Sequence, residues 1–204
     1  MRGLRLSVLT AALIPLAATS SAVHAHLSHQ PTLDIGVYGA WMDIDPLDDD
    51  LIGIGGELEV NWGWLLARGA IEGYEGQGAD TEAVRGAVGL GLIQPWTEDI
   101  AMIGEVGGRY LDHDQQLPWG SDRADVTVEF GLRAWSRAWQ ETQARLRTDM
   151  RAVVAYPTDS DADPQAGGRL ELSAAPAEAG FALFARGEWL SDERSAAVGM
   201  RYRY

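Results

Sequence analysis

The sequence predicts an all-β protein: a closed, antiparallel, up-and-down transmembrane barrel of about ten strands, preceded by a cleavable signal peptide. Eight strands is the alternative count. Three observations predict this fold. Apolar and polar residues alternate with a period of two in one segment after another, the connections between these segments alternate between longer and tighter, and the chain ends inside an alternating segment on an aromatic residue. Because successive side chains of a strand point to opposite faces, each segment has one apolar and one polar face.

The first 25 residues have the three parts of a secretory signal peptide. Arg2 and Arg5 form a positive start, residues 6–18 are apolar without a charge, and small residues before Ala25 mark the cleavage point. The apolar part is too short to cross a bilayer as a helix. The domain assignment is therefore residues 1–25 as signal peptide, 26–32 as a short leader and 33–204 as the barrel domain.

Composition narrows the class of protein and the functions that it can have. The 204 residues contain no cysteine, carry a formal net charge of −14, and include 16 basic residues, all of them arginine. An acidic chain of this kind is not expected to bind nucleic acid. After the signal peptide no stretch approaches 18 consecutive apolar residues, so a membrane protein with this sequence has to cross as a closed barrel.

Ten segments show the alternation. They are residues 33–43, 51–62, 65–75, 83–93, 100–111, 124–136, 143–156, 168–175, 181–190 and 196–204. The connections expected to be longer and acidic are 44–50, 76–82, 112–122, 157–167 and 191–194. Antiparallel pairing places these at one end and the tighter turns, together with both termini, at the other, as in barrels with short periplasmic turns and long outer loops.

One hairpin allows a register to be predicted. Gly63 and Trp64 suit a two-residue turn with glycine in the first central position. Trp62 then faces Leu65, and two further pairs follow: Val60 with Ala67 and Glu59 with Arg68. We expect the last of these to form an ion pair.

Alternation alone does not tell which face of the barrel is outside, because a soluble secreted barrel or sandwich would show the same alternation with the apolar face inside. Glycines are interleaved with the charges, as a narrow lumen that holds long arginines requires. Apolar faces of roughly 9–11 residues match a tilted membrane strand. Tryptophan and tyrosine favour the headgroup level, and the expected interfacial tryptophans are Trp41, Trp62, Trp64, Trp96, Trp139 and Trp189. These features favour an apolar exterior.

The last segment, AAVGMRYRY, resembles the C-terminal assembly signal of Gram-negative outer-membrane β-barrel proteins. Its apolar positions end on an aromatic residue and are Ala196, Val198, Met200, Tyr202 and Tyr204. The resemblance implies location in the outer membrane, recognition by the outer-membrane assembly machinery, contact with lipid and lipopolysaccharide, and closure of the last strand on the first. It is a resemblance to the superfamily of small and porin-like barrels and not to one family within it.

The polar faces define the candidate site, a charged lumen. The residues expected there are Glu57, Glu59, Arg68, Glu72, Arg85, Glu105, Arg109, Glu129, Arg133, Arg145, Arg147, Asp149, Arg151, Arg169, Glu171, Arg186, Glu188, Arg201 and Arg203. A buried charge needs a partner, so a network of ion pairs filling the interior is one interpretation. A pore lining that selects ions is the other.

Other clusters point weakly to chemistry. The acidic loops around Asp48 and Asp161 do not have the spacing of a calcium loop. His113, between two aspartates and near Ser121, is the basis of an enzyme alternative, a hydrolase at the rim. His26 and His29 are expected to be incidental residues of the leader. We therefore expect no catalytic residue, no metal site and no cofactor.

The sequence as a whole predicts a monomeric barrel of the cell envelope with a structural or interaction role and a lumen filled by charge. A narrow porin-like channel for small solutes is the main alternative. An outer-membrane enzyme and a secreted soluble carrier are the remaining ones.

Overall fold

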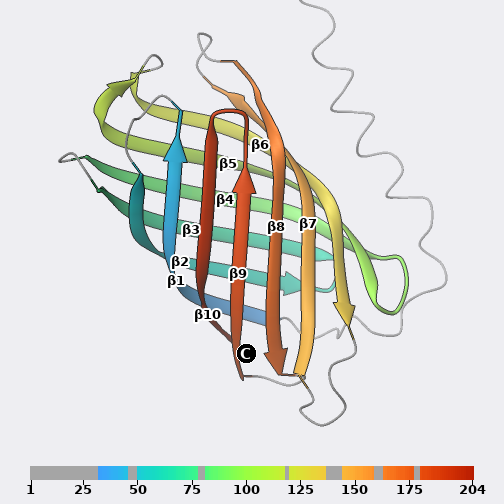
Figure 1. Ribbon diagram of the computed structural model, residues 1–204. Coiled ribbons are helices and arrows are strands. Elements are labelled where there is room, and N and C mark those ends of the chain that lie inside the picture. The colour runs from blue at the N-terminus through green and yellow to red at the C-terminus, as the bar shows by residue number, and fades with distance from the viewer. Residues whose placement is uncertain are drawn as a thin grey trace, which may run out of the picture.

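The ten predicted strands are present and close into one barrel. The computed structural model describes residues 32–45, 50–77, 81–117, 120–136, 144–158, 163–176 and 180–204. Its strands are β1 (Thr32–Ile44), β2 (Leu51–Trp62), β3 (Leu65–Gly76), β4 (Glu82–Pro95), β5 (Ile100–Leu117), β6 (Gly120–Ser136), β7 (Ala144–Pro157), β8 (Gln165–Pro176), β9 (Gly180–Trp189) and β10 (Glu193–Arg203). In Figure 1, β7 to β10 cross in front of β2 to β5 at a steep angle.

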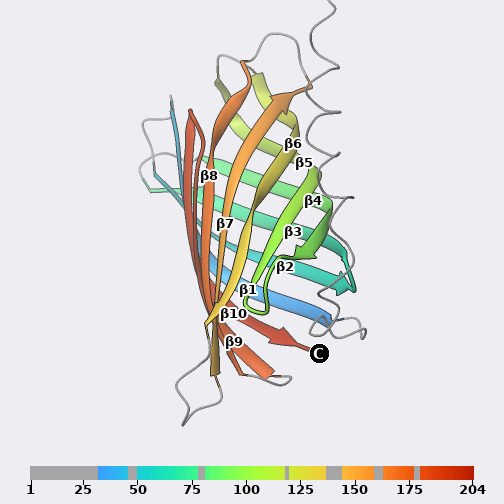
Figure 2. The same cartoon turned by 90° about the vertical axis from the view of Figure 1, so that its right-hand side faces the viewer.

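Each strand pairs antiparallel with its neighbours in sequence, and β1 also pairs with β10, so the sheet has no free edge. The closing seam runs from Asp34 opposite Arg203 to Ile44 opposite Glu193. The backbone N–H of Tyr204 donates to the carbonyl of Leu33 at 2.9 Å, which carries the pairing to the last residue. Figure 2 shows β1, β9 and β10 beside one another at the terminal end of the barrel. The opposite end, which carries the β1–β2, β3–β4, β5–β6, β7–β8 and β9–β10 connections, is called the loop end below.

The apolar side of every strand faces outward. Ile54 is 78% exposed and Leu90 72%, whereas Arg133 on the opposite face is 2% exposed. Outward-facing residues of the described strands carry charge only at the loop end, at Asp43, Glu75, Glu82, Asp112, Asp114, Asp122 and Arg194. A soluble barrel would bury apolar residues such as Ile54 and expose charged residues such as Arg133. The prediction of an apolar exterior is therefore confirmed, and the alternative of a soluble carrier does not fit this structure.

Aromatic side chains mark the two ends of this apolar surface. Trp41 pairs with Ile52 near the loop end, and β2 runs on to Trp62 at the terminal end. Ten residues at about 3.3 Å each, tilted by about 40°, cover roughly 25 Å along the barrel axis, the height of the apolar band of outer-membrane barrels. No helix among the described residues is long and apolar enough to cross a membrane.

The predicted hairpin register is confirmed. Trp62 pairs with Leu65, and Gly63 has the positive φ of 60° that the turn requires. The two further pairs, Val60 with Ala67 and Glu59 with Arg68, are also present.

Two predicted loops are shorter than expected. Most of 112–122 is strand, because β5 continues to Leu117 and β6 begins at Gly120. The stretch has no apolar face, since both sides lie beyond the apolar belt, and alternation therefore gave no signal. Likewise β10 begins at Glu193, so the β9–β10 connection is a tight turn and not one of the longer loops.

Inward-facing glycines occur where a larger side chain has no room. A Cβ on Gly131 would lie 1.9 Å from the carbonyl oxygen of Met150, a backbone atom that cannot move aside. A Cβ on the outward-facing Gly104 would meet nothing within 4 Å. Because Gly104 pairs with Phe130 and Ile103 with Gly131, the two glycines lie close together on opposite faces of one strand pair.

This contrast gives a matched pair of substitutions. We expect Gly131→Ala to lower the free energy of unfolding by about 1–3 kcal/mol, the usual cost of overpacking. Gly104→Ala should leave it unchanged or raise it by about 0.4–1 kcal/mol, because alanine restricts the unfolded chain. Urea unfolding in lipid vesicles measures both, and equal effects would contradict the packing described here.

Candidate functional site: the charged lumen

The lumen holds a balanced ion-pair network. Among the described residues, eleven arginines and eleven carboxylates face inward and are ion-paired. Its arginines are Arg68, Arg85, Arg109, Arg123, Arg133, Arg147, Arg151, Arg169, Arg186, Arg201 and Arg203. Its carboxylates are Asp34, Glu57, Glu59, Glu72, Glu105, Asp125, Glu129, Asp149, Glu171, Glu188 and Glu193. The network is therefore neutral, and the acidic surplus of the chain lies outside it.

Glu129 is a hub of this network. Its carboxylate accepts from Arg68 Nη2 at 3.0 Å and from Arg151 Nη1 at 2.9 Å, and it pairs with Arg169 Nη1 at 2.9 Å. Glu105 lies beside it and binds two of the same arginines, Arg68 and Arg151, each at 2.8 Å. The carboxylate is 5% exposed, so its charge depends on these arginines and not on water.

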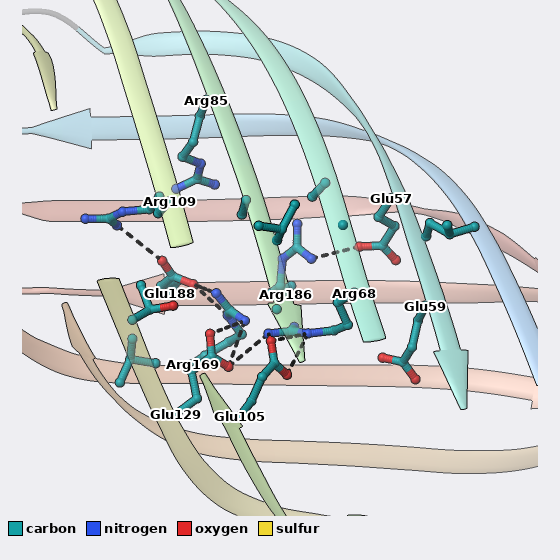
Figure 3. Close-up of a pocket in the computed structure, with 18 of the residues that line it drawn as sticks. Glu57, Glu59, Arg68, Arg85, Glu105, Arg109, Glu129, Arg169, Arg186 and Glu188 are labelled. Atoms are coloured by element: carbon teal, nitrogen blue, oxygen red, sulfur yellow. Dashed lines mark hydrogen bonds and ion pairs between the residues drawn. The ribbon is translucent and has the colours of Figure 1, made fainter. Parts of the chain in front are cut away.

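Several pairs cross the lumen between strands that are not neighbours. Arg133 on β6 donates to Glu59 on β2 at 3.1 Å, and Arg85 on β4 reaches Glu193 on β10 at 2.6 Å. Arg186 on β9 binds Glu57 on β2 at 2.8 Å, the contact drawn at the upper right of Figure 3. These contacts join opposite walls of the barrel in the way that a hydrophobic core joins the sheets of a soluble sandwich.

Aromatic rings complete the polar packing around Glu72. The hydroxyls of Tyr38 and Tyr74 both donate to its carboxylate at 2.7 Å, and Arg85 donates to it as well. The guanidinium of Arg186 lies over the ring of Tyr38, 5.0 Å from the ring centroid. Buried guanidinium groups gain from such ring contacts as well as from carboxylates.

Apolar clusters lie inside the barrel beside the charges. The upper cluster, which includes the loop-end residues of β1 to β5, consists of Tyr38, Ala40, Met42, Ile44, Leu51, Tyr74, Ala83, Leu111, Phe184 and Ala197. The lower cluster, at the terminal end of β3 to β6, consists of Leu66, Ile93, Ala101 and Ile103, with Trp135 packed against it. The alternation did not predict them, because their apolar residues occupy positions of the otherwise polar face.

Little free space remains. A cavity of about 70 Å³ lies among the charges, lined by residues that include Glu57, Arg68, Glu129, Arg186 and Arg201. At ~10–15 Å³ of such space per water molecule, it holds roughly five waters. Figure 3 shows side chains from facing walls meeting across this space.

The structure places the predicted lumen residues on the inner face, with one exception. Arg145 follows the same alternation but lies at the terminal end of β7, where it is exposed. The expected ion pair between Glu59 and Arg68 was wrong, although their register is right. Both side chains reach across the lumen instead, Glu59 to Arg133 and Arg68 to Glu105.

Four members of the network were missing from the predicted set: Asp34, Arg123, Asp125 and Glu193. Asp34 and Asp125 share the inward face with Gly36 and Glu129, so alternation alone was enough to find them. Arg123 and Glu193 fell in segments expected to be loops. Charge balance was a further signal, because the predicted set held more arginines than carboxylates.

The remaining predicted positions are distributed as follows. Trp62, Trp64, Trp96 and Trp189 are more than half exposed, and Trp41 is half-buried. The predicted C-terminal positions Ala196, Val198, Met200, Tyr202 and Tyr204 face outward. Trp139, His26, His29 and the signal peptide lie outside the described residues. His113 is buried while Asp112 and Asp114 are exposed on the other face, so these three do not form a cluster.

Comparison with protein-family models finds no match, and comparison with curated protein sequences finds none. Solved structures with a similar fold exist. The β domain of the Bordetella autotransporter BrkA is 12% identical, with 85% of this chain and 98% of that chain covered and a TM-score of 0.49. An outer-membrane channel from Pseudomonas putida F1 is 11% identical, with 90% and 98% covered and a TM-score of 0.43.

The attachment invasion locus protein Ail of Yersinia pestis is 12% identical, with 85% and 97% covered and a TM-score of 0.39. All three are β-barrels of the Gram-negative outer membrane. At these identities the similarity concerns the fold alone.

The hub at Glu129 provides a test of the network. We expect Glu129→Gln to lower the free energy of unfolding by about 3–5 kcal/mol, the cost of removing one partner of a buried ion pair. Combining it with Arg151→Gln should restore part of this loss, because one unpaired charge is removed. The control is Asp163→Asn at an exposed position. Urea unfolding midpoints that coincide for Glu129→Gln and the control would show that the network does not stabilise the barrel.

Proposed function

We propose that this protein is a monomeric integral barrel of the Gram-negative outer membrane whose role is structural or interactive, and whose lumen does not conduct solutes. The observation that supports this best is the filled interior. Cross-lumen ion pairs and two apolar clusters occupy the interior, and the cavity among the charges has a volume of about 70 Å³. Without a passage for solutes, the surfaces that remain for interaction are the apolar outer belt and the loop end.

The outer belt fits lipid. Its exposed apolar residues surround the barrel, which a monomeric soluble protein does not tolerate. At the loop end the belt stops at acidic side chains, with Arg194 the one basic residue among the outward-facing charges of the described strands. We assign the belt to acyl chains and the acidic loop end to the outer surface, beside lipopolysaccharide.

We also propose that the protein acts without catalysis. A rim hydrolase needs a base within hydrogen-bond reach of a nucleophile and an orienting carboxylate. His113 is buried and faces inward, whereas the neighbouring Asp112 and Asp114 face outward. This arrangement does not bring a base and its carboxylate together.

Conductance in planar bilayers tests the closed lumen. The refolded protein is expected to give no steady current steps under conditions in which a known porin does. Steady steps that change size in Arg147→Gln and Arg151→Gln, but not in the outward-facing control Arg194→Gln, would instead identify the narrow-channel alternative.

The C-terminal strand provides a test of membrane assembly. We expect Tyr204→Ala to reduce the heat-modifiable, outer-membrane fraction several-fold, because Tyr204 directly follows β10, the strand that closes the barrel, and extends its pairing to Leu33. Trp96→Ala is the matched control, an aromatic residue with similar exposure on a turn at the same end. Equal losses in the two variants would mean that the last residue acts only as an interfacial aromatic.

A further inference from the structure

His113 is an unpartnered buried side chain. It faces inward on β5, is 3% exposed, and neither ring nitrogen has a hydrogen-bond partner among the described residues. Leaving a buried polar group unpaired is costly, so such groups are rare in folded proteins. It is also the only histidine within the described ranges. The position therefore calls for an explanation beyond packing.

The residue lies directly beyond the upper cluster. Its cross-strand partner on β4 is Ala83, and the preceding inward residue of β5 is Leu111, both buried members of that cluster. His113 is thus the next inward side chain toward the loop end. In its neutral form the imidazole is apolar enough to lie over this cluster.

The charges near His113 on its own strand and on β4 are already matched. The inward residues are Arg85, diagonal to His113 on β4, and Arg109 on β5. Arg85 is held by Glu72 and by Glu193 at 2.6 Å. Arg109 is held by Glu193 at 3.1 Å. A protonated imidazole would be an additional cation beside two arginines.

The charged residue near His113 on β6 is also already matched. Arg123 lies diagonal to His113 and donates to Asp125 at 2.8 Å, and Asp125 also accepts from Arg109 at 2.8 Å. On β4, β5 and β6, the remaining described carboxylates next to His113 are on the outer face and are exposed: Glu82, Asp112, Asp114 and Asp122. An imidazolium would therefore find its partners outside the barrel and not within it.

The backbone at this point permits such a movement. The regular β5–β6 register ends at Asp112 opposite Asp122, shifts, and resumes at Leu117 opposite Gly120. His113 is the first residue past the regular β5–β6 ladder and still pairs with Ala83 on β4. Movement of the hairpin end about this irregularity opens the Ala83–His113 pair at the end of the β4–β5 ladder and leaves the β1–β10 pairs that close the barrel intact.

We propose that His113 is a pH-sensitive latch for the end of the β5–β6 hairpin. Imidazole is the side chain whose charge changes between pH 5 and 8. Neutral His113 is buried over the upper cluster and holds the hairpin end at the mouth of the barrel. Protonation moves the imidazolium out to water and the outer carboxylates, and the hairpin end moves with it. The closed form is favoured as pH rises and is lost as pH falls.

Hydrogen exchange on the folded protein in lipid nanodiscs tests the latch. Protection of the described hairpin-end amides, 112–117 and 120–123, is measured at pH 7.5 and 5.0 and corrected for intrinsic exchange rates. We expect protection to fall at least tenfold at pH 5.0, while amides 58–66 at the terminal end stay unchanged. Hairpin-end protection that is equal at the two pH values would overturn the proposal.

Two variants separate His113 from other titrating groups. His113→Leu, which carries no charge, should stay protected at both pH values, and His113→Lys should be open already at pH 7.5. Acid opening that persists in His113→Leu would assign the effect to the carboxylates and overturn the latch. If either variant fails to fold, the imidazole NMR titration of the wild type decides. Its midpoint must coincide with the loss of protection, and a different midpoint contradicts the proposal.

Discussion

The constraint on which the structure depends is that every arginine in the lumen must meet a carboxylate there. Water is scarce inside, so a charge without a partner is costly. A slip of one residue in any strand would turn its arginines toward lipid and its leucines inward. Arginine at the middle of a bilayer costs about 2–4 kcal/mol per residue. The ion pairs inside and the apolar belt outside therefore specify the same register.

Pairing across the lumen does more than neutralise charge. Contacts such as those of Arg133 with Glu59 and Arg85 with Glu193 join strands that are far apart in the sheet. They give the barrel a core made of polar groups. Arginine suits this role because its planar group binds two carboxylates at once and stacks on rings such as that of Phe184.

The interior is divided into zones. Charges line the central cavity, and apolar clusters lie on parts of the wall toward each end. Inward glycines let the walls approach, as Gly55 does against the ring of Tyr38, where a Cβ would lie 2.5 Å from a ring carbon. A conducting barrel of this size would need small side chains on both facing walls, with water between them.

Charge is unevenly distributed between the lumen and the outer parts of the barrel. The lumen network is neutral, so the acidic character of the chain is concentrated in the connections and at the loop end. His113 lies at the boundary between these two regions. The apolar upper cluster lies on one side of it and the acidic exterior on the other, which is the setting of the proposed latch.

The sequence by itself determined the ten strands, the face that each turns to lipid, and the register of the β2–β3 hairpin. These follow from local rules: a period of two, and a turn in which Gly63 adopts positive φ. Most lumen residues were predictable for the same reason. The partner of each charge was not, because it depends on how facing walls are staggered after closure. That is why Glu59 binds Arg133 and not Arg68. The extension of β5 and β6 beyond the apolar belt and the burial of His113 were likewise decided only by the tertiary structure, where backbone pairing continues without an apolar face to signal it.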